Sequence, residues 1–234
     1  VQWREPLHRH GMIFVAASRS GNEVPILDRR LPLALLAYEN VRRLYPLDPE
    51  RIYLAGFSGG SRAALVTALA YPDVFRGVVL EAGSDPIGGE RGIHLPPADL
   101  FRRFEESRLV YVTGEQDRVN LHDDLVSRDS MRQWCVLEVA VLRPRQLGHE
   151  LMGPAWLDHA LEALEGPTAA DAGERAACNS RVEQELEGRL AEVEAALGRG
   201  DRRGARARLR EIDGHFAGLA GPALLDLDAR VGAP

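Results

Sequence analysis

The stretch RIYLAGFSGGSRAAL, residues 51–65, places Ser58 among glycines, after a run of strand-forming residues and before a run of helix-forming residues. The pattern Gly-x-Ser-x-Gly is typical of a strand that turns sharply into a helix and exposes the serine at the turn. Such a turn brings the backbone at Gly56 and Gly60 into close contact, which leaves no room for a side chain at either position. We therefore expect Ser58 to lie in a strained conformation at the N-terminus of a helix.

Short apolar runs alternate with helical patterns from residue 1 to about residue 165. The strand patterns are apolar on both faces, as in strands that helices cover on each side. We therefore predict an α/β domain over residues 1–167, with a mostly parallel sheet and helices on both faces. The expected strands are 11–18, 51–57, 75–83, 108–114 and 135–142, and the expected helices are 28–44, 60–70, 97–107, 121–134 and 154–165.

The composition changes in residues 168–234, where no strand pattern occurs and Ala, Glu and Arg dominate. Ser180 with Glu183 predicts a capping box at the start of one helix, and Asp201 predicts the cap of a second. Both helices have one apolar face, so this tail is predicted to form an α-helical hairpin. A lone hairpin buries too little apolar surface to be stable, so we expect the tail to pack on the α/β domain or on a partner.

The overall composition restricts the classes of protein that this chain can belong to. Of its 234 residues 45% are hydrophobic, which suits one large domain or a medium domain with an appendage. All 29 basic residues are arginine, which excludes chemistry that needs a lysine amine, and the net charge of −6 argues against nucleic-acid binding. No apolar stretch is long enough to span a membrane and no signal-peptide pattern occurs, so we expect a soluble protein. Because the chain begins at Val1, a leader upstream for secretion or export to a periplasm stays an open alternative.

The cysteines and histidines do not have the spacing of metal ligands. Cys135 and Cys178 are either one disulfide or two unrelated thiols, and the sequence does not choose between these alternatives. His8 and His10 are two residues apart, so on a helix they do not face the same way, and no third ligand is spaced to help them. We therefore predict neither a metal site nor a cofactor.

A serine hydroxyl acts as a nucleophile when a histidine takes its proton and a carboxylate orients that histidine. Asp117 follows the expected strand 108–114, and His149 lies in the loop after the last expected strand. The carboxyl ends of parallel strands meet at one edge of a sheet, so we expect Ser58, Asp117 and His149 to lie together there. The N–H of Gly59, at the start of the helix, points to where a carbonyl oxygen would gain negative charge.

Each of these assignments has an alternative. If Ser58 is not a nucleophile, the turn is a glycine-rich turn that binds a phosphate or nothing. If His149 is not a base, it is a helix-capping or solvent-exposed histidine. The carboxylate partner of the histidine is otherwise Glu115, Asp123 or Asp124, which lie near Asp117 in the sequence.

Three segments carry a resemblance to a known family: LDPERIYLAGFSGGSRAALVTALAYPDVFRGVV, VYVTGEQDRVN and LGHELMGPAWLDHALEAL. Residues 1 to about 165 resemble the α/β-hydrolase fold, and more narrowly the bacterial esterases around polyhydroxybutyrate-depolymerase-like and feruloyl-esterase-like proteins. The resemblance implies a serine hydrolase that cleaves small-molecule or polymeric esters through an acyl-enzyme, without a cofactor. It also implies that Ser58 is the nucleophile, that His149 is the general base and then acid, that Asp117 orients it, and that Gly59 gives one oxyanion-hole N–H.

One part of the family pattern is missing. In that fold the second oxyanion donor follows a strand that lies between the strands carrying GMIFVAAS and RIYLAGF, and this sequence has no such strand. Only VQWREPLHRH precedes Gly11, and it resembles the helix after the missing loop. We therefore expect either a fragment without its first three strands or a rearranged sheet. Two other functions stay open: a non-catalytic module that binds a partner through its helical tail, and a serine peptidase of the same fold.

Overall fold

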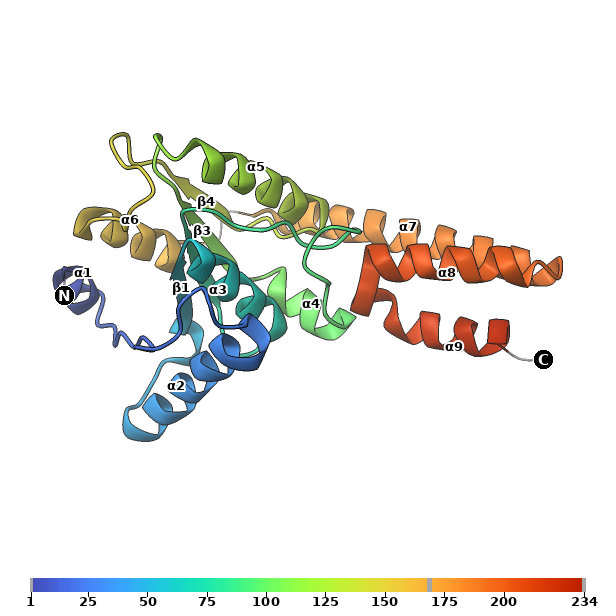
Figure 1. Cartoon of the computed structure of the whole chain (residues 1–234), viewed down its shortest axis with the longest axis horizontal. Coiled ribbons are helices and arrows are strands. Elements are labelled where there is room, and N and C mark those ends of the chain that lie inside the picture. Colours follow the sequence, from blue (N-terminus) through green and yellow to red (C-terminus); the bar gives the residue numbers. More distant parts are fainter. Residues whose placement is uncertain (1, 168–169, 233–234) are drawn as a thin grey trace.

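Four parallel strands form the sheet of the computed structural model, which describes residues 2–167 and 170–232. The strands are β1 (Tyr53–Phe57), β2 (Gly77–Glu81), β3 (Arg108–Val112) and β4 (Val139–Leu142), and they lie side by side in this order (Figure 1). Phe57 on β1 pairs with Glu81 on β2, which pairs with Val112 on β3. The carboxyl ends of these strands therefore lie at one edge, as predicted, and each strand falls inside an expected strand range.

Helices cover both faces of the sheet. The α/β part contains α1 (Arg4–Arg9), α2 (Leu31–Leu44), α3 (Gly59–Ala70), α4 (Ala98–Phe104), α5 (Arg118–Gln133) and α6 (Pro154–Glu165), with a short π-helix η1 (Ile26–Arg30) and a short 3-10 helix η2 (Pro49–Arg51). Val79, Val110 and Val112 point to the face that α6 and α1 cover. Leu80, Tyr111 and their neighbours point to the other face, against α3, α4 and α5. This alternation of side chains gives the sheet two buried faces, as the apolar strand patterns predicted.

The strand expected at residues 11–18 is not formed. Residues 12–17 have neither helix nor strand, and among the residues that the structure describes no strand pairs with them or with the free edge of β1. A strand exists only when a neighbour supplies its hydrogen-bonding ladder. In the fold that the sequence resembles, that neighbour is the strand missing between this segment and β1. The apolar pattern is therefore present without the pairing that would make it a strand.

Within residues 170–232 the tail contains the predicted pair of packed helices, α7 (Ala172–Gly198) and α8 (Arg202–Phe216), and a further helix that was not predicted, α9 (Gly221–Gly232), after a short 3-10 helix η3 (Ala217–Ala220). The predicted capping box is wrong, because Ser180 lies inside α7 and Asp171 caps that helix by accepting a hydrogen bond from the Glu174 N–H at 3.0 Å. The cap predicted at Asp201 is confirmed by its bond from the Gly204 N–H at 2.8 Å. The earlier Asp171-x-x-Glu174 pattern is the same kind of helix-start signal.

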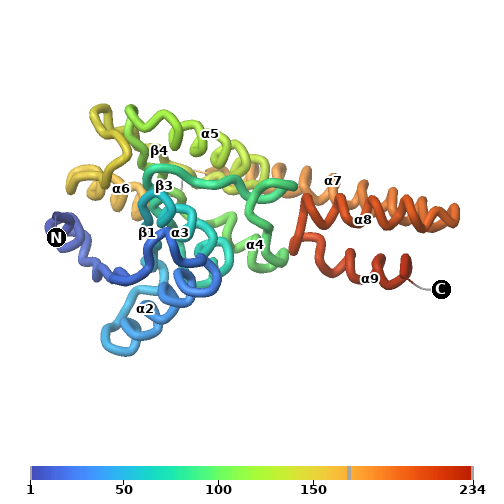
Figure 2. The backbone as a smooth tube through the Cα atoms, in the orientation of Figure 1, coloured from blue at the N-terminus to red at the C-terminus, as the bar shows by residue number. Residues whose placement is uncertain are grey.

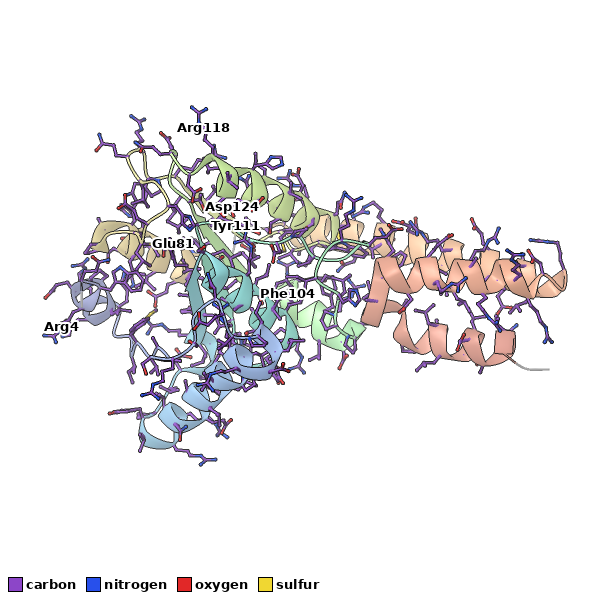
Figure 3. The ribbon with its side chains drawn as sticks, in the orientation of Figure 1. Arg4, Glu81, Phe104, Tyr111, Arg118 and Asp124 are labelled. Carbon is purple, nitrogen blue, oxygen red and sulfur yellow. A yellow bond between two sulfur atoms is a disulfide. The ribbon has the colours of Figure 1, made fainter. Side chains whose placement is uncertain are left out.

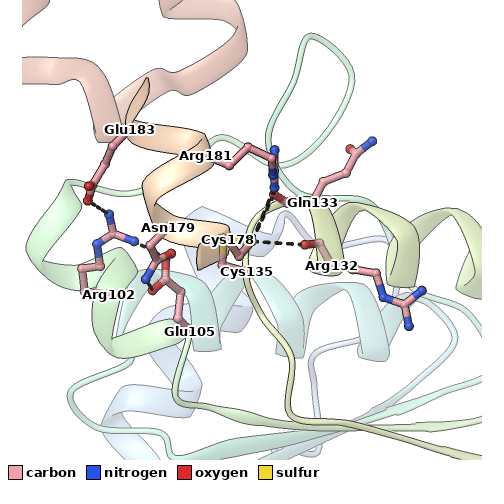
Figure 4. The surroundings of a disulfide bond; sticks show 9 residues. All are labelled: Arg102, Glu105, Arg132, Gln133, Cys135, Cys178, Asn179, Arg181 and Glu183. Atoms are coloured by element: carbon pink, nitrogen blue, oxygen red, sulfur yellow. Dashed lines mark hydrogen bonds and ion pairs between the residues drawn. A yellow bond between two sulfur atoms is a disulfide. The ribbon is translucent and has the colours of Figure 1, made fainter. Parts of the chain in front are cut away.

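The tail extends away from the sheet but packs on the α/β part at its near end (Figure 2). A disulfide joins Cys135, after α5, to Cys178 on α7, and beside it the Asn179 amide donates a hydrogen bond to Glu105 at 3.0 Å (Figure 4). The Trp134 ring packs edge-on against Phe216 of α8, with centroids 5.6 Å apart. The buried side chains of the tail and of the α3 side of the sheet form one cluster. A domain boundary at residues 167 and 168 stays a prediction.

None of the helices in the described ranges is both long and apolar enough to cross a membrane.

Candidate active site

The serine turn is strained and closely packed at Gly56 as the sequence predicts, but the lack of room predicted at Gly60 is wrong, because a Cβ placed there would lie 3.7 Å from its nearest neighbour. Ser58 lies between the end of β1 and the start of α3 with φ 54° and ψ −121°, a region that residues with a side chain rarely adopt. A Cβ placed on Gly56 would lie 2.0 Å from the carbonyl oxygen of Gly60, so only glycine fits there. The Ser58 N–H donates to the Glu81 carbonyl oxygen at 2.8 Å, which ties the strained turn to β2. The surrounding structure thus holds the serine side chain at the edge of the sheet.

The structure brings Ser58, His149 and Asp117 together. The Nε2 atom of His149 lies 3.1 Å from the Ser58 hydroxyl oxygen, and its Nδ1 atom lies 2.7 Å from an oxygen of Asp117. Asp117 lies after β3 and is 8% exposed, whereas His149 lies in the loop between β4 and α6 and remains accessible. With Nδ1 protonated toward Asp117, the Nε2 atom is free to accept the serine proton. Three groups from three loops therefore form one continuous line of hydrogen bonds.

Asn120 holds the Asp117 carboxylate in place. Its side-chain N–H₂ donates to both carboxylate oxygens, at 3.0 and 2.8 Å, and Asp117 also caps α5 by accepting from the Asn120 backbone N–H at 3.4 Å. Burial alone would raise the pKa of Asp117, but hydrogen bonds from His149 and Asn120 outweigh it, so this pKa is lowered. The carboxylate is therefore charged when the histidine gains a proton. Sequence reasoning missed Asn120, although Asp-x-x-Asn at a helix start is a recognisable signal of such a contact.

The three alternative carboxylates do not contact His149. Asp123 accepts a hydrogen bond from Arg62 at 2.8 Å. Asp124 lies on the buried side of α5, where burial raises its pKa to about 6 (Figure 3). Glu115 is exposed. Of the acidic residues considered from the sequence, only Asp117 lies beside the histidine ring.

The N–H of Gly59 begins α3, and the side chain of Asn22 lies against this residue. A Cβ on Gly59 would meet the Asn22 side-chain oxygen at 2.3 Å and its amide nitrogen at 2.9 Å. Asn22 comes from the irregular segment before α2, and nothing in the sequence pattern pointed to it. An amide at this place adds a polar group beside the first N–H groups of a helix, where negative charge is favoured.

The buried Glu81 carboxyl was also missed by sequence reasoning. Glu81 ends β2 near the middle of the sheet and is 2% exposed (Figure 3). One of its carboxyl oxygens accepts a hydrogen bond from the Met152 N–H. Met152 follows His149 in the same loop, so this bond joins the histidine loop to the sheet. Burial raises the pKa of Glu81 to about 7, and the single bond from Met152 opposes the shift only in part.

This raised pKa predicts that Glu81 makes the fold less stable as pH rises. Below pH 4.5 the carboxyl is protonated in both states, whereas between about 4.5 and 7 only the unfolded chain releases the proton. The shift corresponds to about 3 kcal/mol of folding free energy lost by pH 8. Glu81→Gln keeps the acceptor for Met152 and cannot ionise. Urea unfolding at pH 4.5 and at pH 8 measures the free energy of unfolding of both proteins. Between these pH values we expect the variant to gain about 2–3 kcal/mol of stability relative to the wild type. If the stability difference between variant and wild type is the same at both pH values, Glu81 does not titrate in the folded protein over this range.

Of the two histidines that the sequence analysis compared with metal ligands, His10 is engaged by carboxylates. The two ring nitrogens of His10 lie 2.6 Å from Glu165 and 3.2 Å from Asp158. Within residues 2–167 and 170–232 no group of three or more His, Cys, Asp or Glu side chains is arranged to hold a metal ion.

The strained serine turn and Asp117 lie in a part of the chain that matches a known family. Residues 35–122 match the family of esterase PHB depolymerases. The match includes Ser58 and Asp117 and ends before His149. Over these residues the match confirms the sequence-based resemblance to this family. No curated protein matches the sequence.

Solved structures share the fold at low sequence identity. An uncharacterized protein from Bacillus cereus is 16% identical over 70% of this chain and 53% of its own, with a TM-score of 0.50. SOBER1 from Arabidopsis thaliana is 17% identical over 60% of this chain and 63% of its own, with a TM-score of 0.43. A ferulic acid esterase is 15% identical over 56% of this chain and 58% of its own, with a TM-score of 0.44. This chain thus spans less than two thirds of the length of each. The predicted α/β-hydrolase-like fold with a helical tail is confirmed.

Proposed function

We propose that this chain is a serine hydrolase that cleaves carboxylic ester bonds. The observation that carries the proposal is the line of hydrogen bonds from Ser58 through His149 to Asp117, with contacts of 3.1 and 2.7 Å. A serine in a strained strand-to-helix turn, next to the N-terminus of α3, is the arrangement in which such a line performs acyl transfer. The family match to esterase PHB depolymerases supports an ester rather than another acyl compound as substrate.

In this proposal Ser58 attacks the ester carbonyl while His149 takes its proton at Nε2. The charged Asp117 stabilises the imidazolium that forms and keeps its Nδ1 proton in place. The Gly59 N–H, at the start of α3, donates to the carbonyl oxygen as it becomes negative. His149 then gives the proton to the leaving alcohol, and the acyl-enzyme remains. A water that His149 activates releases the acid and restores the serine.

Two assays on the purified chain test the proposal. A fluorophosphonate probe is expected to label the protein covalently, because the probe reacts with serines that an adjacent histidine activates. A p-nitrophenyl ester is expected to be hydrolysed, whereas a peptide library is expected to stay intact. Cleavage of peptides in preference to esters would assign a peptidase. Absence of both labelling and turnover would favour a non-catalytic module that binds a partner through its helical tail.

A further inference from the structure

The loop between β2 and α4, residues 82–97, begins beside the triad. A Cβ placed on Gly83 would lie 2.2 Å from the side-chain oxygen of Asn120, so the loop backbone lies against the amide that holds the triad carboxylate. The Asp85 carboxylate then accepts a hydrogen bond from the Arg62 guanidinium at 3.0 Å. Arg62 belongs to α3, the helix that begins at the serine turn. The loop therefore starts in contact with the two helices that position the nucleophile and its carboxylate.

The helix that Asp117 caps, α5, also holds the backbone of this loop. The Ser127 hydroxyl donates a hydrogen bond to the Asp85 carbonyl oxygen at 2.8 Å, and the Ser130 hydroxyl accepts one from the Ile87 N–H at 2.9 Å. Both serines are buried. Buried polar groups are costly to leave without a partner, so the loop and α5 are expected to move as one unit.

The helical tail contacts the far part of the same loop (Figure 1). The Gly89 N–H donates to the His215 carbonyl oxygen at 2.9 Å, and the Gly218 N–H donates to the Leu95 carbonyl oxygen at 3.0 Å. These two bonds join the loop to the end of α8 and to η3. A Cβ placed on Gly218 would lie 2.7 Å from the carbonyl carbon of Pro96, so the two backbones are in close contact there. The tail thus supports the loop that lies against the triad.

One covalent bond fastens the tail to α5. Cys135 follows the end of α5 and Cys178 lies near the start of α7, so the disulfide joins the tail to the end of α5 opposite to Asp117. The two cysteines are 43 residues apart in the sequence. A cross-link restricts how far the tail can move from α5 when its other contacts break. Tail, loop and α5 are therefore held together most tightly while the disulfide is intact.

The surroundings of the disulfide accommodate its reduced form (Figure 4). The Arg181 guanidinium lies 3.4 Å from the Cys178 sulfur, and a cation at this place stabilises the thiolate that reduction produces. The Arg132 carbonyl oxygen lies 3.7 Å from the same sulfur and can accept a hydrogen bond from the thiol. Cys135 is buried, whereas Cys178 is only half-buried and offers a reductant access to the bond.

We propose that the Cys135–Cys178 disulfide is a redox switch that controls the rate of ester hydrolysis through the tail and the loop 82–97. This inference rests on the proposed function. A dithiol reduces the bond by thiol–disulfide exchange: its two thiols are oxidised to one disulfide, and each cysteine gains one electron and one proton. Without the cross-link the tail separates more often from the loop, and the bonds of the Gly89 and Gly218 N–H groups break with it. The contact of the loop with the start of α5 then loosens, so the oxidised protein is the more active form.

Amide hydrogen exchange and ester hydrolysis of the full chain, before and after reduction, test the proposal. The reductant is the phosphine TCEP, which becomes a phosphine oxide and adds no thiol to the ester assay. After reduction we expect exchange at the Gly89 and Gly218 N–H groups to become at least about tenfold faster. We expect kcat/KM for p-nitrophenyl acetate to fall at least about tenfold, and reoxidation to restore both values. A Cys135→Ser/Cys178→Ser double variant is expected to match the reduced wild type and not to respond to TCEP.

Gly218→Ala tests the contact between tail and loop while the disulfide stays intact. The added Cβ meets the backbone at Pro96, so this variant is expected to show faster exchange at the Gly89 N–H and a lower kcat/KM in its oxidised form. Gly214→Ala is the matched control, because it lies on α8 and a Cβ placed there meets no described atom within 4 Å outside its own helix. It is expected to behave as the wild type. If Gly218→Ala fails to fold, reduction of the wild-type protein decides by itself.

Three results would overturn the switch. The first is an equal kcat/KM for oxidised and reduced protein, and the second is unchanged exchange at the Gly89 and Gly218 N–H groups. The third is exchange on β2 and β3 that accelerates as much as exchange in the loop, which would mean that reduction only destabilises the whole fold. Each of these leaves ester hydrolysis by the oxidised protein standing. An oxidised protein that neither hydrolyses esters nor reacts with the fluorophosphonate probe would instead contradict the proposed function, and the switch with it.

Discussion

We expect Ser58→Ala to lower kcat for a p-nitrophenyl ester by about 10⁴- to 10⁶-fold, because the nucleophile of a triad cannot be replaced by its partners. Covalent labelling by the fluorophosphonate probe is expected to disappear with it. Steady-state kinetics and gel fluorescence measure the two effects. The hydroxyl forms a hydrogen bond with the exposed His149 ring at 3.1 Å and none with a buried group of the described chain, so thermal unfolding is expected to stay close to that of the wild type.

Ser61→Ala provides the matched control on the same helix. Ser61 is buried in α3, and within the described residues its hydroxyl oxygen has no hydrogen-bond partner, so it takes no part in the line to His149. This variant is expected to keep both turnover and labelling. Labelling that survives in Ser58→Ala, or disappears in Ser61→Ala, would remove Ser58 from the role of nucleophile.

Asp117→Asn is expected to lower kcat by about 10⁴-fold with little change in KM, because an amide neither stabilises the imidazolium nor keeps the Nδ1 proton in place. Asn120 and His149 both approach this carboxylate, and its lowered pKa keeps it charged at neutral pH. The activity loss is therefore expected at every pH at which the wild type is active. A pH–rate profile of both proteins measures it.

Asp123→Asn is the control for this substitution. Asp123 lies on the same helix, pairs with Arg62 at 2.8 Å and does not contact His149. We expect its activity to remain within about tenfold of the wild type, since the change removes a partly exposed ion pair. If Asp123→Asn were as inactive as Asp117→Asn, the assignment of Asp117, rather than Asp123, as the carboxylate that orients His149 would be wrong.

Local sequence patterns were sufficient for much of the site. The apolar run before Ser58 and the glycines around it predicted a strand, a close backbone contact and a helix, because these features depend on residues within one turn of each other. The order of strands and helices then placed Asp117 and His149 at the same edge. In contrast, Glu81 reaches the histidine loop through packing between elements, and nothing in its sequence neighbourhood distinguishes it from an ordinary polar residue.

The sequence by itself determined where the strands of the sheet and the serine turn lie, because periodicity and steric limits act between near neighbours. Only the tertiary structure decided whether residues 11–18 become a strand, since a strand needs a partner and that segment finds none in the described chain. Tertiary structure likewise decided that Cys135 and Cys178 pair, because a disulfide requires two distant side chains to meet. It also decided that the outer edge of β1 faces an apolar cavity, which no local pattern specifies.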